Sequence, residues 1–197
     1  MESVAPALIA FTAAVLVGFG SHFVAEDYRR FRDSKAIAAA LAGELRSIML
    51  SIPELHTSLT RMKDLLDSLQ PIPLPEMPDQ SSPMFEANAE KVGLLGVELA
   101  GGVAFLYDQI RAFRSSFQLL SRHHSKMDPS WSSLLVGRCI QLIDSNKLEA
   151  NNLIENLQKH SESSYVMSKS VGMVMLSGIT LLSISSLFGA IFCIRPS

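Results

Sequence analysis

Cysteine and the familiar catalytic motifs are scarce in this sequence. Only Cys139 and Cys193 are cysteines, and there is no GxxxxGK(S/T) phosphate loop, no GxGxxG, no HExxH and no CxxC. His123 and His124 are adjacent, so on a helix they point about 100° apart and do not easily share one metal. We therefore predict no catalytic, cofactor-binding or metal-binding residues, no cofactor and no enzyme activity.

An excess of charge of one sign is also lacking. The 197 residues include 17 basic and 19 acidic side chains, which gives a formal charge of −2. Hydrophobic residues make up 48% of the chain, and the mean hydropathy is +0.25. This balance excludes a disordered tail and a basic nucleic-acid-binding protein. We expect no nucleic-acid partner.

Two long stretches carry no formal charge. The first has 21 residues, 4–24 (VAPALIAFTAAVLVGFGSHFV), and the second has 24 residues, 171–194 (VGMVMLSGITLLSISSLFGAIFCI). As helices, both are long enough to cross a hydrocarbon core of about 30 Å. A cleaved signal peptide is the alternative for the first, but "MES" carries no positive charge and no clear cleavage site follows. We predict transmembrane helices over 4–25 and 171–194.

The flanks of these stretches predict their orientation. Basic residues follow the first stretch and precede the second, and only one lies beyond it: Arg29, Arg30, Arg32, Lys35; Lys159, Lys169; Arg195. Lys and Arg near membrane-spanning ends are retained in the cytoplasm. We therefore predict a multi-pass protein of a bacterial inner membrane, with both termini periplasmic, residues 26–170 cytoplasmic and the lipid bilayer as a partner.

The predicted topology also fixes the surroundings of single side chains. Tyr28 and Tyr165 lie near the inner membrane interface, where amphipathic rings are favoured. Cys139 falls in the cytoplasmic part and Cys193 near the outer end of the second span, so we expect no disulfide between them.

The segment 26–70 carries a heptad seam. Its apolar positions alternate in steps of four and three: Leu41, Leu45, Ile48, Ile52, Leu55, Leu59, Met62, Leu66 and Leu69. Pro53 lies inside this seam, in "SIPE", which could be a capping box that restarts a helix. Because the heptad phase survives across Pro53, we favour one helix with a kink.

A second seam predicts a helix from about Val97 to His124. It also steps by four and three: Leu99, Val103, Leu106, Ile110, Phe113, Phe117 and Leu120. Asp128 before Pro129 then indicates the start of a third helix over residues 130–170. No proline interrupts that segment, so we expect it to continue into the second span.

Helix length constrains how these segments are arranged. At about 1.5 Å per residue, the helix over 26–70 extends on the order of 65 Å from the membrane. The second and third helices form a hairpin, so the linker 71–83 must return towards the membrane before the second begins. This linker holds five of the nine prolines and is predicted to be extended. A proline-rich ligand for a partner domain is the alternative reading of "PIPLP". The predicted fold is all-α, with two transmembrane helices flanking a three-helix antiparallel coiled-coil-like bundle.

Several features of the two predicted spans are candidates for function. His22 is an ionisable residue near the end of the first span, and such residues are functional candidates by default. The alternative is that it reaches the cytoplasmic interface or nearby carboxylates. Small residues that permit close helix packing recur in both spans: Ala10, Ala14 and Gly18; Ser177, Ser185 and Gly189. They could pair the spans with each other or with a second copy.

The basic residues after the first span could also bind anionic lipid. Their role in topology already explains them. Three acids lie among them, Glu26, Asp27 and Asp33, and these argue against a dedicated lipid switch.

The region 84–170 is predicted to begin with a short corner helix before the hairpin. Ser82 would be the N-cap and Pro83 the first helical residue of a helix ending near Lys91. Gly93 would then take a left-handed conformation and Gly96 would permit the next turn. On this basis Gly93→Val should loosen the bundle. A ligand-binding loop is the alternative.

Residues 84–107, "MFEANAEKVGLLGVELAGGVAFLY", resemble a segment of a group of bacterial two-span membrane proteins with no assigned activity. The matching positions are Phe85, Asn88, Lys91, Gly93, Leu94, Leu95, Phe105 and Tyr107. "AIAAALAGELRSI", Ala36–Ile48, is similar to the first cytoplasmic helix of that group. The resemblance covers about a third of the chain and implies the two-span topology, but no catalysis.

Together these features predict a non-enzymatic scaffold or protein-interaction module. A protein partner or a second copy would bind through the heptad seams and the small-residue stripes. A membrane-linked sensory or signal-relay element is the alternative, and a small pore or transport accessory subunit is the third possibility.

Overall fold

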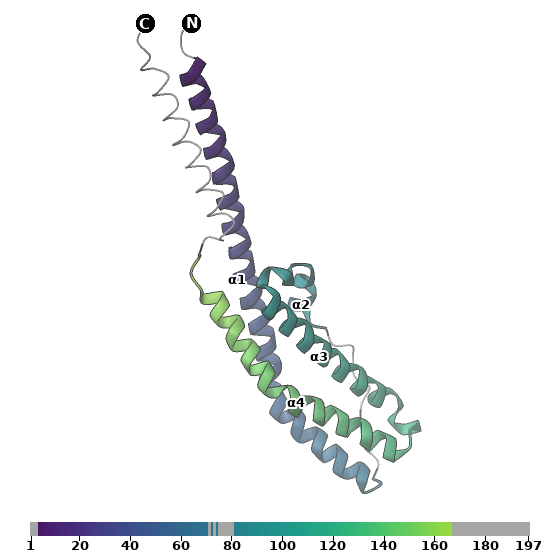
Figure 1. Cartoon of the computed structure of the whole chain (residues 1–197). Helices are drawn as coiled ribbons and strands as arrows, with labels where there is room; N and C mark the ends of the chain where they lie inside the picture. Colours follow the sequence, from purple (N-terminus) through teal and green to yellow (C-terminus); the bar gives the residue numbers. More distant parts are fainter. Residues whose placement is uncertain (1–3, 71, 73, 75–80, 167–197) are drawn as a thin grey trace, which may run out of the picture. The chain divides into compact units, whose positions relative to one another are not determined.

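The computed structural model describes residues 4–70, 72, 74 and 81–166, and every regular element in these ranges is helical (Figure 1). The described ranges contain four α-helices and two short 3₁₀ helices: α1 (Val4–Asp67), α2 (Pro83–Asn88), η1 (Ala89–Leu95), α3 (Val97–His123), η2 (His124–Lys126) and α4 (Pro129–Glu162). The all-α prediction is confirmed for this part of the chain.

Helix α1 continues through Pro53, as the unbroken heptad phase predicts. Ser51 does not start a new helix. Its Oγ donates to the carbonyl of Ile48 at 2.8 Å, and Thr57 Oγ1 donates to the carbonyl of Pro53 at 2.9 Å. The capping-box alternative is therefore wrong.

The predicted end of the first bundle helix, near Gln70, is three residues too late. Helix α1 ends at Asp67, and Leu69 takes a left-handed conformation with φ 56°. Leu69 is 79% exposed, whereas Leu66 is buried. The heptad seam therefore ends at Leu66, because the backbone after Asp67 no longer holds the helical phase.

Two apolar clusters form the core of one compact unit, Ser34–Ser163. The first cluster joins the 37–45 part of α1 to η1, the start of α3 and the end of α4: Ile37, Ala38, Leu41, Ala42, Leu45, Val92, Leu95, Val103, Leu106, Tyr107, Ala150, Leu153, Ile154 and Leu157. The second joins the end of α1 and Ile72 to the end of α3 and the start of α4: Leu59, Leu66, Ile72, Leu120, Val136 and Cys139. Helices α1 and α3 therefore run in the same direction and α4 runs against both. The predicted hairpin and returning linker agree with this arrangement.

Helix boundaries in the hairpin follow the predicted signals at three of four ends. Helix α3 begins at Val97 and ends at His123, one residue before the predicted end. Asp128 is the N-cap of α4, and its side chain accepts a hydrogen bond from the backbone N–H of Ser130 at 2.8 Å.

The fourth end corrects the sequence prediction, because α4 ends at Glu162 instead of running on through residue 170. Ser163 has φ −61° and ψ 150°, which is extended backbone. The Oγ and backbone N–H of Ser163 both donate to the carbonyl of His160, and Lys35 Nζ donates to the Ser163 carbonyl at 2.8 Å. These bonds satisfy polar groups at the helix end without a Gly or Pro stop signal.

One described helix is long and apolar enough to cross a membrane, judged by length and composition alone. This stretch is Gly20–Asp67 of α1, and a signal sequence or a core helix would meet the same criterion. It overlaps the predicted span 4–25 only at residues 20–25. It also includes Leu41 and Leu45, which are buried in the first core cluster, so packing within the bundle explains part of its apolar character. The second predicted span, 171–194, lies outside the described residues.

The other compact unit combines residues 1–33 with 164–197. Its described residues are those of α1 up to Asp33 and the short segment 164–166.

Candidate functional site

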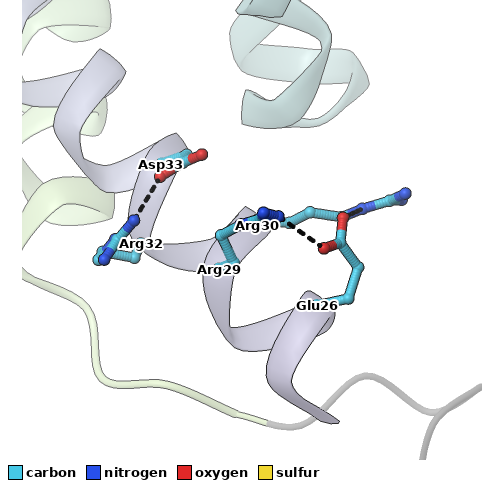
Figure 2. Close-up of polar contacts among 5 residues, drawn as sticks. All are labelled: Glu26, Arg29, Arg30, Arg32 and Asp33. Carbon is cyan, nitrogen blue, oxygen red and sulfur yellow. Dashed lines mark hydrogen bonds and ion pairs between the residues drawn. The ribbon is translucent and has the colours of Figure 1, made fainter. Parts of the chain in front are cut away.

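The charged segment that follows the first predicted span lies on exposed turns of α1 (Figure 2). Glu26 accepts from Arg30 Nε at 3.1 Å and from Arg29 Nη1 at 3.5 Å, and Arg32 pairs with Asp33 at 3.4 Å. Exposed pairs of this kind contribute about 0–1 kcal/mol each. Two of the three acids named in the sequence, Glu26 and Asp33, therefore lie beside the arginines, where they partly neutralise the cluster.

Tyr165 joins the two chain segments that flank the predicted spans. Its hydroxyl donates to Asp27 Oδ2 at 2.8 Å. Its ring meets Tyr28 edge-on at 5.3 Å and lies 5.4 Å from the ring of Phe31, between centroids. The hydrogen bond to the Asp27 carboxylate raises the pKa of Tyr165. Tyr28 and Tyr165, which the sequence places separately at one interface, are in direct contact.

A second pair of contacts ties the end of α4 to α1 inside the bundle unit. Ser34 Oγ and His160 Nε2 are 3.0 Å apart, and Lys35 Nζ donates to the carbonyl of Ser163. Ser34 is buried. Each contact joins residues more than 120 positions apart, so no local pattern in the sequence could have predicted it.

The corner that the sequence singles out is built around Glu44. One carboxylate oxygen of Glu44 accepts from the backbone N–H of Met84 at 3.0 Å, and the other accepts from Phe85 N–H at 3.2 Å and from the Tyr107 hydroxyl at 2.5 Å. The rings of Phe85 and Tyr107 stack with centroids 4.1 Å apart. Burial, followed by the bond to Glu44, raises the pKa of Tyr107.

Ser82 is therefore at the N-cap position of α2 but does not cap it. Its side chain makes no capping bond. Its Oγ instead accepts from Arg114 Nη1 at 2.8 Å, and its backbone N–H donates to Glu86 Oε1 at 3.0 Å. The carboxylate of Glu44, 40 residues away, satisfies the helix N–H groups that a Ser82 cap would have bound.

The positive φ predicted for Gly93 occurs at Gly96 instead. Gly96 has φ +84°, whereas Gly93 does not have a positive φ and lies inside η1. A Cβ added at Gly93 would meet no atom within 4 Å. The predicted short helix to Lys91 is α2 to Asn88 followed by η1, and the left-handed residue comes three positions later than expected. The expectation that Gly93→Val loosens the bundle is wrong in its premise.

A groove of about 700 Å³ lies beside this corner, between α1, α2 and α3. Aromatic rings line it together with charges of both signs: Phe85, Tyr107, Phe113 and Phe117; Glu54, Glu86, Arg111 and Arg114. The mixed charges favour neither an anion nor a cation.

The histidines and cysteines considered in the sequence do not form a common site in the described part of the chain. His22 is exposed, with its ring 6.3 Å from that of Phe23. His123 and His124 lie at the end of α3, and no group of three or more His, Cys, Asp or Glu in the described ranges could hold a metal ion. Cys139 is buried, which raises the pKa of its thiol to about 11. Cys193 lies outside the described residues.

One of the two small-residue stripes can be located. Ala10, Ala14 and Gly18 are exposed along α1, and a Cβ added at Gly18 would meet no atom within 4 Å. This stripe is therefore open to another helix. The stripe of Ser177, Ser185 and Gly189 lies outside the described residues.

Comparison of the chain with protein-family models, with curated proteins and with solved structures finds no match. The resemblance of residues 84–107 to a two-span group therefore stays a prediction.

Proposed function

We propose that this chain is a two-span membrane protein whose cytoplasmic helical bundle acts as a scaffold or protein-interaction module. The contact of Tyr165 with Asp27 and Tyr28 carries the proposal. Asp27 comes two residues after the span 4–25, and Tyr165 six residues before the span 171–194. Their contact joins the described segments that flank the two apolar stretches, and this supports a pair of neighbouring transmembrane helices.

The packing of the bundle limits which surfaces a partner can bind. Both heptad seams are used within the chain, since Leu41, Leu45 and Val103 are buried in the first core cluster. A partner that bound through the seams would have to open the bundle. The open stripe of Ala10, Ala14 and Gly18 needs no such rearrangement, and small residues let membrane helices approach closely. We therefore assign pairing with a second copy, or with another membrane protein, to this stripe.

A signal-relay role is the second candidate. It is favoured by one observation, namely that α1 has no interruption between its N-terminal apolar part and the bundle core. In that case a ligand or a change at the span would alter crosslinking between α1 and α4. A scaffold would show the same crosslinks with and without the stimulus.

Reporter fusions test the membrane topology. A reporter active only in the cytoplasm should work when fused after Gln80, and a periplasmic reporter should work at the C-terminus. Export of the Gln80 fusion would overturn the proposed topology, and release of the chain from membranes by alkaline carbonate would overturn membrane insertion itself.

Crosslinking in native membranes tests the interaction role. A cysteine at Ala14 in a Cys139→Ser, Cys193→Ser background should crosslink to a second copy or to a partner that mass spectrometry can identify. The control is a cysteine at Phe23, which is exposed on the opposite face of the same helix, about 180° from Ala14. Equal crosslinking at Phe23 and Ala14 would contradict the stripe as the contact surface.

A further inference from the structure

Helix α4 contains a third heptad seam, in which several positions are polar or small. Its inward positions again step by four and three: Ser132, Val136, Cys139, Ile143, Asn146, Ala150, Leu153 and Leu157. All of these except Ile143 and Asn146 are buried. In the middle of the seam, Asn146 and Ala150 stand where a coiled-coil-like bundle would have large apolar side chains.

Ala150 lies at the edge of the first core cluster and Asn146 lies between the two clusters, beside a space that is partly open to solvent. A cavity of about 180 Å³ is lined there by α1, α3 and α4, which lie side by side in Figure 1. Apolar side chains dominate the lining, among them Ile48, Met49 and Ile110. An apolar cavity of roughly 150 Å³ in a well-packed protein holds a six-carbon ring, so this one has room for about six to eight carbon atoms.

The charged residues at this cavity are of one sign. Arg114 of α3 and Lys147 of α4 line it, and none of its described lining residues is acidic. Lys147 is exposed, and no ion pair in the described part of the chain engages it. Arg114 donates a hydrogen bond to Ser82 and also lines the neighbouring groove, where Glu54 and Glu86 lie. Lys147, beside the apolar lining, therefore complements a ligand with a short apolar body and one anionic end.

We propose that the cavity between α1, α3 and α4 binds a free medium-chain carboxylate, with its hydrocarbon part beside Ala150 and Asn146 and its carboxylate at Lys147. The small volume selects one short chain over a phospholipid with two long ones. This site goes beyond the scaffold role and does not depend on it, because it lies wholly within the bundle.

Octanoate is the probe, with octan-1-ol as the uncharged ligand of the same length. The full chain, labelled with ¹³C at its methionine methyl groups and held in nanodiscs, is titrated with each ligand. Met49 lines the cavity and Met84 does not, so the two methyl signals distinguish binding at the site from partition into the bilayer. Octanoate should shift the methyl signal of Met49 until the site is saturated. It should also bind at least ten-fold more tightly than octan-1-ol.

Two variants test the two halves of the site. Ala150→Leu fills the hollow and should abolish the octanoate-dependent shift of Met49, whereas the matched change Asn151→Leu, on the exposed side of the same helix turn, should leave it unchanged. Lys147→Gln should weaken octanoate several-fold and leave octan-1-ol unaffected. Lys147 is exposed, so this variant tests the proposal even if Ala150→Leu disturbs the fold.

Three results would overturn the proposal. The first is a Met49 signal that does not respond to octanoate in the unmodified chain. The second is equal affinity for octanoate and octan-1-ol. The third is a folded Ala150→Leu chain that binds octanoate as before while its thermal midpoint rises, which would make the hollow a packing defect.

Discussion

The hydroxyl of Tyr107 donates a hydrogen bond of 2.5 Å to the carboxylate of Glu44, and this bond joins α3 to α1 across 63 positions of sequence. The same carboxylate accepts from two backbone N–H groups at the start of α2. Glu44 thus fixes three elements at one point. It does so in place of the local serine cap that the sequence predicts.

Glu44→Ala should destabilise the bundle by about 1–3 kcal/mol, because it leaves partly buried N–H and O–H donors without their acceptor. Chemical denaturation followed by circular dichroism measures this loss. Glu149→Ala is the control, since Glu149 is exposed on α4. Equal stability of the two variants would show that water replaces the Glu44 carboxylate at no cost.

Tyr107→Phe should alter the dependence of stability on alkaline pH. Burial and Glu44 raise the pKa of Tyr107 in the folded chain, whereas the unfolded chain releases this proton near pH 10. The stabilising contribution of Tyr107 is therefore complete below about pH 10 and is lost as the pH rises above that value. The difference in unfolding free energy between the two chains should shrink between pH 9 and pH 11. A constant difference would contradict the raised pKa.

Gly96→Ala should cost about 1–3 kcal/mol of stability, because φ +84° with ψ 164° is a backbone conformation that essentially only glycine adopts. Gly93→Ala provides the matched comparison, three residues earlier in the same corner. Its backbone is not left-handed and its added Cβ meets nothing within 4 Å, so it should be neutral or slightly stabilising. Thermal unfolding of both variants measures which substitution lowers the stability more. A larger loss of stability for Gly93→Ala would show that the positive φ is not at Gly96.

Cys139 should resist alkylation in the folded chain. In a Cys193→Ser background at pH 8, iodoacetamide should modify it at least ten-fold more slowly than in denaturant. The thiol is buried and its pKa is raised to about 11, so little thiolate forms and the reagent has poor access. Mass spectrometry over time gives both rates. Similar rates would mean that the second core cluster opens readily.

Asp128→Ala should lower the thermal midpoint, because it removes the N-cap of α4. Asp128→Asn should keep the midpoint close to that of the unmodified chain, because asparagine also caps helices. The bonds from Ser130 hold the pKa of Asp128 below its ordinary value of 3.8. Its contribution is therefore present above about pH 4 and lost as the pH falls through the lower folded value. An Asp128→Ala midpoint equal to that of the unmodified chain at pH 7 would argue against the cap.

Features with a local or periodic cause were predictable. The seams from Leu41 to Leu66 and from Leu99 to Leu120 fixed the helical phase and the direction of the hairpin. Asp128 before Pro129 marked the start of α4 to within one residue. The third seam was missed because Asn146 and Ala150 interrupt its apolar pattern, although the spacing of its members could have revealed it.

The sequence by itself determined which segments are helices and which faces they bury, because heptad spacing and prolines act within a few turns of chain. Only the tertiary structure decided that Glu44 caps α2, that Gly96 takes the left-handed turn, that α4 ends at Glu162 and that a hollow remains beside Ala150. The cap by Glu44, the bond from Lys35 at the end of α4 and the hollow depend on side chains that are far apart in sequence and adjacent only after folding. The hydrogen bonds and the packing that select them do not exist in the separate segments.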